Sequence, residues 1–310
     1  MDFIAIDFET ATSKRHSPCE IGLTFVENDE IMDTKTWLIR PPSYPYFNEY
    51  NIRIHRITPD DVKDAPIFAD LWDDLSHLLA GRFLVAHNAS FDLSVLRRTL
   101  EHYTIPFPDL TYGCTLAFAK KVWSGLPDYG LEALCKHHHI PLKPHRAGPD
   151  SKATAELALK IFSHSDVKSV DEITEKIQVN LGKCFEGGYV PCENVQIKSP
   201  RTGHYEQVSA KDVVGDSSGQ NPESPFFGKS VVFTGTLSSM TRKDAFQVVA
   251  GLGGIPSNGV TKTTDFLVVG QQDYRVGQDG MSRKQRKAIE SVKKGGHIEI
   301  LSEDDFIKNL

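Results

Sequence analysis

The sequence predicts an α/β protein with two domains. Apolar runs of strand length alternate with segments whose apolar residues recur at helical spacing, over residues 1–165 and again over 226–310. A chain of 310 residues is long enough for about two domains, each with a core of its own. Residues 166–225 contain Gly-, Ser- and Pro-rich stretches, which indicate a linker region with room for a small hairpin at 195–208.

The chain begins with a strand that carries two acids. Residues 3–10 (FIAIDFET) are apolar enough to be buried, and side chains on a strand alternate between its two faces. Asp7 and Glu9 are therefore expected on one face, where two carboxylates resist burial unless a cation lies between them. A hard divalent metal is the natural candidate. Because Asp-x-Glu pairs also occur at solvated strand ends, the metal interpretation depends on further acids downstream.

The next segments predict a meander and then helices. Strands are expected at 20–26 and 36–39, with a polar turn at 27–33, so the first three strands form an antiparallel meander. Prolines at positions 41, 42 and 45 then end the regular structure. Thr58 caps a predicted helix whose first residue is a proline, and a second helix follows over 68–79.

A strand at 83–86 leads into a helix marked by leucines at 93, 96 and 100. Asp92 therefore lies at a strand-to-helix junction, where α/β domains often place functional side chains. An acid at this position also favours the helix dipole, so the pattern allows either role.

The last predicted helix of this domain follows a histidine and an acid. A helix near 129–134 ends at three consecutive histidines, which do not share a helix face and are better explained by the helix C-terminus than by a metal. Gly148 and Pro149 then turn a loop into a helix over 151–162, with Asp150 at its start. His145 lies on the approach, where it can lean over a metal held by Asp150.

Together these residues predict metal-assisted hydrolysis of a phosphodiester. Two divalent ions can activate a water, neutralise the phosphate and stabilise the leaving oxygen. The four carboxylates supply suitable ligands, and a histidine can accept the proton of the water near neutral pH. The residues of this set are Asp7, Glu9, Asp92, His145 and Asp150.

Residues 1–162 resemble the DnaQ-like 3′→5′ exonucleases of the DEDDh type. The resemblance is carried by DFET at 7–10, HNASFD at 87–92 and HRAGPD at 145–150, whereas Ala11 and Thr12 replace a Thr-Gly pair found in many relatives. It implies an RNase H-like exonuclease domain with a mixed sheet, two Mg²⁺ or Mn²⁺ ions and single-stranded 3′ ends as substrate. The implied roles are metal binding by Asp7, Glu9, Asp92 and Asp150, general base for His145, and substrate binding for Phe8, Thr10 and Asn88.

The C-terminal part predicts a small parallel sheet. Strands are expected at 229–235, 264–270 and 297–301, separated by helices that begin near Thr241 and Arg283, and a final helix begins after Ser302.

This order resembles a BRCT domain, with Phe306 in place of the tryptophan often found near its end. In relatives that bind phosphate, a hydroxyl before a glycine and two cations at helix starts form the pocket. The matching residues here are Thr234, Gly235, Arg242 and Lys284. Such a set makes a plausible phosphate site. The alternative is a protein-docking module whose cations are solvated.

Charge and composition limit the location of the protein. The net charge is −6, with 23 Lys and Arg against 32 Asp and Glu in residues 1–225 and 12 against 9 in residues 226–310. No apolar run reaches the length of a membrane span, and no signal peptide is expected. The five cysteines are scattered without C-x-x-C spacing, which argues against disulfides or zinc and favours a cytoplasmic location.

The sequence therefore predicts a metal-dependent 3′→5′ exonuclease for single-stranded DNA ends. The BRCT module is expected to bind 5′-phosphorylated DNA ends or a repair or replication protein. One alternative is a nuclease of RNA 3′ ends, because no residue distinguishes deoxyribose from ribose. The other is a non-catalytic binding scaffold, which is expected to lack some of the five catalytic residues, whereas all five are present.

Overall fold

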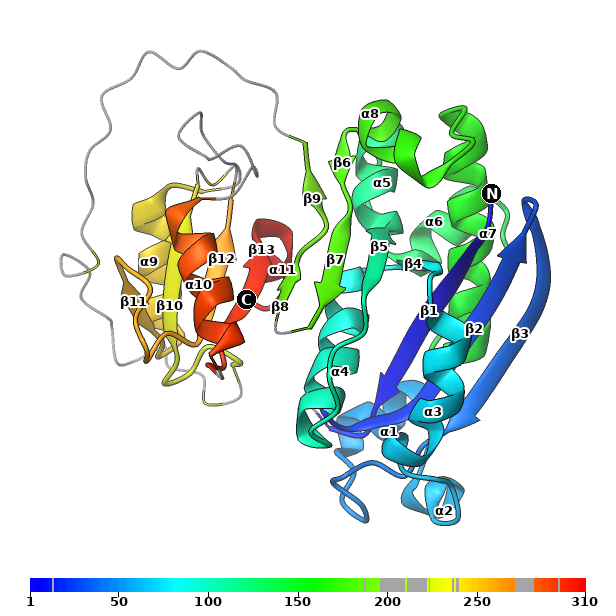
Figure 1. Ribbon diagram of the computed structural model, residues 1–310, viewed down its shortest axis with the longest axis horizontal. Coiled ribbons are helices and arrows are strands. Elements are labelled where there is room, and N and C mark those ends of the chain that lie inside the picture. Colours follow the sequence, from blue (N-terminus) through cyan, green and yellow to red (C-terminus); the bar gives the residue numbers. More distant parts are fainter. Residues whose placement is uncertain are drawn as a thin grey trace. The chain divides into compact units, whose positions relative to one another are not determined.

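The computed structural model describes residues 1–12, 14–186, 188–195, 210, 222, 224–235, 237, 240–270, 282–294 and 296–310. They divide into two compact units, Met1–Glu186 and Gly187–Leu310, whose elements are labelled in Figure 1. The hairpin predicted at 195–208 lies outside the described residues from position 196 onward.

A mixed sheet forms the centre of the first unit. Strand β1 pairs antiparallel with β2, and β2 with β3, which confirms the predicted meander. On its other side β1 pairs in parallel with β4, β4 pairs in parallel with β5, and β7 is antiparallel to β5. The bounds of these strands are β1 (Phe3–Thr10), β2 (Pro18–Glu27), β3 (Glu30–Leu38), β4 (Phe83–Ala86), β5 (Leu110–Cys114) and β7 (Gly182–Phe185).

Helices cover this sheet, and the predicted ones at 59, 68 and 89 are present. Thr58 and Asp61 form a capping box at the start of α2, as the sequence indicates. Helix α7 packs against β1 and β2, and its apolar residues Ala153, Leu157 and Ile161 are buried. The helices are α1 (Glu49–His55), α2 (Pro59–Val62), α3 (Phe68–Leu79), α4 (Ala89–His102), α5 (Thr115–Val122), α6 (Leu131–His137), α7 (Ala147–His164) and α8 (Ile173–Ile177).

The prediction at the first hairpin was wrong. The turn comprises only Asn28 and Asp29, both with positive φ (52° and 63°), and β3 begins at Glu30 rather than at residue 36. The exposed residues of β3 look like a loop because this edge strand offers few apolar side chains. Residues 166–194 also contain regular structure, namely α8, β7 and the short strands β6 (Val179–Asn180), β8 (Gly188–Val190) and β9 (Glu193–Asn194).

The second unit contains the predicted parallel sheet, in the order β11-β10-β12-β13. Capping boxes begin α9 at Thr241 and α10 at Ser282. The short strand β11 was not predicted. The elements are β10 (Ser230–Thr234), α9 (Arg242–Gly251), β11 (Ile255–Ser257), β12 (Phe266–Val269), α10 (Arg283–Lys293), β13 (Glu299–Ser302) and α11 (Glu303–Lys308).

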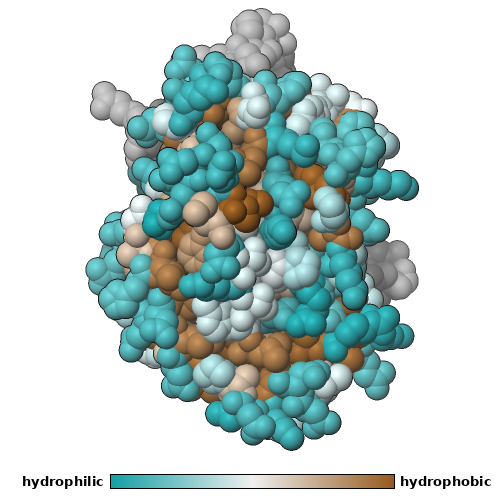
Figure 2. All heavy atoms as spheres, turned by 90° about the vertical axis from the view of Figure 1, so that its right-hand side faces the viewer, coloured by the Kyte–Doolittle hydropathy of each residue, from teal (hydrophilic) through white to brown (hydrophobic). Residues whose placement is uncertain are grey.

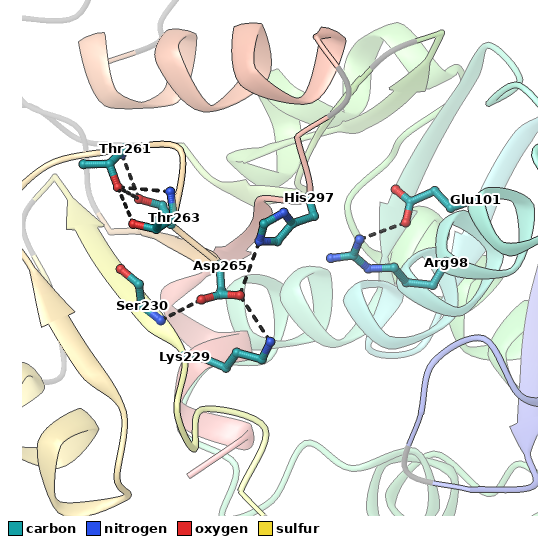
Figure 3. A network of polar contacts seen from close by, with 9 residues as sticks. Arg98, Glu101, Lys229, Ser230, Thr261, Thr263, Asp265 and His297 are labelled. Atoms are coloured by element: carbon teal, nitrogen blue, oxygen red, sulfur yellow. Dashed lines mark hydrogen bonds and ion pairs between the residues drawn. The ribbon is translucent and has the colours of Figure 1, made fainter.

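Phe306 is fully buried in the core of this unit, with its ring centroid 5.0 Å from that of Phe233 and 5.3 Å from that of Phe226. A polar network fixes the start of β12 (Figure 3). There, Asp265 accepts the backbone N–H of Ser230 at 2.8 Å and pairs with Lys229 at 3.2 Å and His297 at 3.4 Å.

Figure 2 shows a face covered mostly by hydrophilic residues, with hydrophobic residues in bands between them. No helix in the described part of the chain combines the length and the apolar character that crossing a membrane requires.

Candidate active site

Three carboxylates meet at the C-terminal half of β1. Asp7 and Glu9 are half-buried, whereas Phe8 and Thr10 between and after them are buried, so the predicted alternation is confirmed. Oxygens of Asp7, Glu9 and Asp150 all lie within 4.8 Å of one another. Strand β1 and helix α7 thus bring together acids that are more than 140 residues apart in sequence.

Asp150 is anchored through one of its two oxygens. It lies in the first turn of α7, where Oδ2 accepts the backbone N–H of His145 at 2.9 Å. Its Oδ1 is buried and has no hydrogen-bond partner among the described residues. A buried carboxylate oxygen without a partner is costly, so this atom is suited to receive a cation.

Asp92 lies beside this group rather than within it. Its side chain is 1% exposed in the first turn of α4, and Oδ1 accepts the backbone N–H of Phe8 at 3.0 Å. This bond ties the start of α4 to β1. The charge of Asp92 also acts on Asp7, so the two carboxylates share one electrostatic environment.

Burial and the charge of neighbouring carboxylates, Glu20 among them, raise the pKa values of all four acids. Burial is the main cause for each: it raises the pKa of Asp7 well above its usual value, and those of Glu9 and Asp92 to about 8. The pKa of Asp150 rises to about 6, because backbone N–H groups partly offset the burial. Carboxylate oxygens are hard ligands, and a divalent metal ion would offset the negative charge that is crowded and buried here.

His145 is exposed next to this cluster. Its backbone has a positive φ of 69°, and its N–H donates to Asp150 as described above. The charge of its imidazole acts to lower the pKa of Asp150. The sequence prediction of a histidine on the approach to Asp150 therefore matches the position found.

Sequence reasoning missed Glu20, a fully buried acid on β2. Its carboxylate accepts hydrogen bonds from Arg146 Nε at 3.0 and 3.1 Å and from Arg146 Nη2, and from the backbone N–H of Ala147 at 2.8 Å. It thereby holds the two residues that follow His145. The sequence feature that could have identified Glu20 is an acidic residue inside an otherwise apolar predicted strand.

The three predicted substrate-binding residues, Phe8, Thr10 and Asn88, differ in their contacts and exposure. Thr10 O accepts hydrogen bonds from Asn51 Nδ2 at 2.8 Å and lies 3.2 Å from His55 Nε2, both on the unpredicted helix α1. The Phe8 ring is 2% exposed and packs against Phe68, so Phe8 offers the site its backbone and not its ring. Asn88 is half-buried in a left-handed conformation before α4.

The second unit brings its four predicted residues together. Arg242 donates to Gly235 O, Lys284 Nζ donates to Phe233 O at 2.7 Å, and Thr234 Oγ1 donates to Ser282 Oγ at 2.9 Å. Burial, and then the charge of Arg242, lowers the pKa of Lys284 to about 8, and burial also lowers the pKa of Arg242. Two cations are thus held close together and partly out of water.

Comparisons with known proteins agree with this arrangement. The Exonuclease family model matches residues 4–158, and that of the BRCA1 C Terminus (BRCT) domain matches residues 221–305. A 3'-5' exonuclease DinG of Staphylococcus epidermidis is 32% identical over 185 residues, which cover 58% of this chain and 20% of the relative. A DNA polymerase III PolC-type of Caldanaerobacter subterraneus is 29% identical over 178 residues, which cover 56% of this chain and 12% of the relative.

Among solved structures, "Exonuclease X in complex with 5' overhanging duplex DNA" is 28% identical, with a TM-score of 0.47, and the match covers 56% of this chain and 99% of that one. The chain spans a fifth or less of the two curated relatives. The family match extends over half of its length and includes all three acidic motifs. The chain therefore belongs to the exonuclease family and carries a BRCT domain after its exonuclease region.

Proposed function

We propose that this chain is a metal-dependent 3′→5′ exonuclease that removes nucleotides from single-stranded 3′ ends of DNA. The observation that carries the proposal is the meeting of Asp7, Glu9 and Asp150, with one buried oxygen of Asp150 unpartnered. The 3'-5' exonuclease named among the relatives and the DNA polymerase III beside it support the polarity and the polymer.

Two Mg²⁺ or Mn²⁺ ions, when bound, supply charge that polarises the phosphate and stabilises the leaving oxygen. Asp7, Glu9, Asp92 and Asp150 hold them. His145 accepts a proton from the water whose oxygen forms the new bond to phosphorus. The bond from phosphorus to the 3′ oxygen of the preceding nucleotide breaks, which releases a nucleoside 5′-monophosphate. The backbone of Phe8, together with Thr10 and Asn88, positions the terminal nucleotide.

A degradation assay tests this function. Single-stranded DNA and matched RNA, each labelled at the 5′ end, are incubated with the wild type and with His145→Ala in Mg²⁺, Mn²⁺ or EDTA. We expect a ladder that shortens from the 3′ end, requires metal and is lost in the variant. The relative rates on the two polymers decide between a DNA and an RNA exonuclease. Absence of cleavage of both polymers in either metal would favour the binding scaffold.

We further propose that the BRCT unit binds a phosphate through Thr234, Gly235, Arg242 and Lys284. Burial lowers the pKa values of both cations, and the charge of Arg242 lowers that of Lys284 further, so an anion bound beside them would favour their charged forms. The phosphate belongs to a 5′-phosphorylated DNA end, and a repair or replication protein is the alternative partner. Either would deliver the exonuclease to its substrate.

A further inference from the structure

A group of basic side chains lies next to the carboxylates of the first unit. Lys14, Arg15 and His16 come from the loop after β1, and Arg98 and His102 come from α4; together they are called the basic edge. The His16 and His102 rings stack with centroids 5.3 Å apart and planes 9° apart. Burial lowers the pKa of His16, and the nearby charges of His102, Lys14 and Arg98 lower it further. These side chains are therefore close enough to form one surface.

Hydrogen bonds fix the loop that presents this edge. Ala11 N–H donates to Ser17 O at 2.8 Å, and Ser17 Oγ donates to Lys14 O at 2.6 Å. The hydroxyls of Thr12 and Ser17 are 2.8 Å apart. Because Ala11, Thr12 and Ser17 are buried, these hydrogen bonds anchor the described residues that flank Lys14, Arg15 and His16 after β1.

Arg15 connects the basic edge to the catalytic carboxylates. Its guanidinium carbon lies 4.3 Å from the ring centroid of Phe91, the residue before Asp92. The charge of Arg15 acts to lower the pKa of the Asp92 carboxyl. A guanidinium has five N–H donors in one plane, and contact with an aromatic face holds such a cation in place, which suits it to the recognition of phosphate.

The charge of the edge is opposite to that of its surroundings. Residues 1–225 hold 32 acidic against 23 basic residues, yet Lys14, Arg15 and Arg98 cluster beside the site, with Glu101 paired to Arg98 at 2.8 Å. Cations at this place repel metal ions and attract anions. The flat rings of Phe91, His16 and His102 add surfaces on which unpaired bases can stack.

We propose that the basic edge binds the phosphates of the substrate strand on the 5′ side of the nucleotide being removed. Arg15, stacked on Phe91, is the central contact, with Lys14 beside it. The edge holds the strand while its 3′ end lies at the carboxylates. This inference rests on the proposed exonuclease function and adds the surface that distinguishes a polymer from a single nucleotide ester.

Kinetics on two substrates test the edge. One substrate is a 12-nucleotide single strand, and the other is the p-nitrophenyl ester of thymidine 5′-monophosphate, which has one phosphodiester and no upstream strand. For Arg15→Ala and Lys14→Glu we expect KM for the strand to rise about tenfold or more, as loss of a charged hydrogen bond implies. We expect a much smaller loss of kcat/KM on the ester. The slope of log affinity against log salt should fall by about 0.7 per lost contact.

The matched control is Lys168→Glu, an exposed lysine beyond the C-terminal end of α7. That helix has 18 residues and is about 27 Å long, so Lys168 is remote from Asp150. An equal loss on both substrates, or an unchanged KM for the strand, would overturn the proposal. If the wild type cleaves neither substrate, the exonuclease proposal fails. The edge is then judged by fluorescence anisotropy of the labelled strand, where Arg15→Ala in the His145→Ala background must weaken binding.

Discussion

The acids of the site are individually unfavourable in the absence of a cation. Asp92 and Asp150 each accept a backbone N–H, from Phe8 and His145 respectively. These bonds fix the orientation of the carboxylates and do not remove their repulsion, since all four acids keep raised pKa values. Protonation or a bound cation would relieve the cost of burying these charges together.

The raised pKa values predict how stability depends on pH. An acid with a raised pKa binds its proton more tightly in the folded state, so between about pH 4 and pH 8 Glu9 and Asp92 hold more protons in the folded metal-free protein than in the unfolded chain. Its stability should therefore fall as the pH rises through this range. We expect Tm in EDTA to drop from pH 5 to pH 8 by more in the wild type than in Asp92→Asn, and Mg²⁺ to restore it at pH 8.

Asp92→Asn is a suitable comparison because its amide oxygen can still accept the Phe8 N–H. Groups remote from the site change Tm equally in both proteins, so the difference between them reports Asp92 together with the acids whose pKa its charge raises, Asp7 among them. A Tm difference that does not vary with pH would contradict the raised pKa of Asp92.

Glu20 should act on catalysis through the residues after His145. Glu20→Gln removes the charge that holds Arg146 and weakens the contact to Ala147, so the His145 loop becomes less defined. We expect kcat to fall by about 10- to 100-fold, as for residues that orient metal ligands, with little change in KM for the strand. Steady-state kinetics on labelled single strands measure both constants.

The control for this change is Glu27→Gln, on the same strand. Glu27 pairs with Arg82 at 3.4 Å, but its side chain is 46% exposed, so this ion pair contributes little. Wild-type kcat in Glu20→Gln, or an equal loss in both variants, would refute a positioning role for Glu20.

The two kinds of site residue differ in how far the sequence predicted them. Asp7, Glu9, Asp92, His145 and Asp150 stand in local patterns that tie acids to strand ends and helix starts, so they could be identified. Glu20 and Arg15 contact residues distant in sequence, Arg146 and Phe91, and a single residue in a strand or loop gives no sign of such a contact.

At the scale of elements, the close approach of α7 to β2 places Asp150 opposite β1. Gly22 makes this approach possible, because a Cβ at this position would lie 2.0 Å from Ala147 O and 2.6 Å from Gly148 N. These are backbone atoms at the start of the helix and cannot turn aside. The position of Asp150 therefore depends on a glycine in a different strand.

Gly22→Ala should move the start of α7 away from β2. We expect a loss of about 1–3 kcal/mol of stability, as for overpacked sites, and a larger proportional loss of kcat, because Asp150 shifts relative to Asp7. Urea unfolding and kinetics measure the two effects. Gly251→Ala serves as the control, since a Cβ there meets nothing within 4 Å. Unchanged stability in Gly22→Ala would show that the helix start can adapt.

Elements with strong periodicity were predicted, and those that depend on distant pairing were not. Helices α3 and α4 have repeating leucines and an apolar face, whereas α1 has seven residues and one buried side chain, His55. Strand β7 has four residues and obtains its partner, β5, from a segment about 70 residues earlier. Short segments such as β7 take their structure from the sheet that they join. Their own composition does not indicate that they form a strand.

At the scale of the whole molecule, the chain joins an acidic exonuclease region to a smaller basic unit. Residues 1–225 carry more acidic than basic side chains, 32 against 23, whereas residues 226–310 carry 12 basic against 9 acidic ones, so a polyanion is repelled less by the second part of the chain. The BRCT match at residues 221–305 was predictable because its strands, caps and glycine turn follow one another locally. Of the four residues proposed to bind phosphate, Lys284 has a pKa lowered to about 8.

Lys284→Glu tests the function of the basic unit. Lys284 donates to Phe233 O, and its pKa is about 8. It therefore loses its positive charge at a pH only slightly above neutral. We expect the variant to bind a 5′-phosphorylated duplex at least tenfold more weakly, with a shallower salt dependence, while its rate on the thymidine ester stays at the wild-type value. Wild-type binding of the duplex should also weaken as the pH rises above about 8, because Lys284 then loses its proton.

The control for net charge is Lys262→Glu, which changes an exposed lysine of the same unit. Equal binding of phosphorylated and unphosphorylated duplex by the wild type would leave protein docking as the function of this unit.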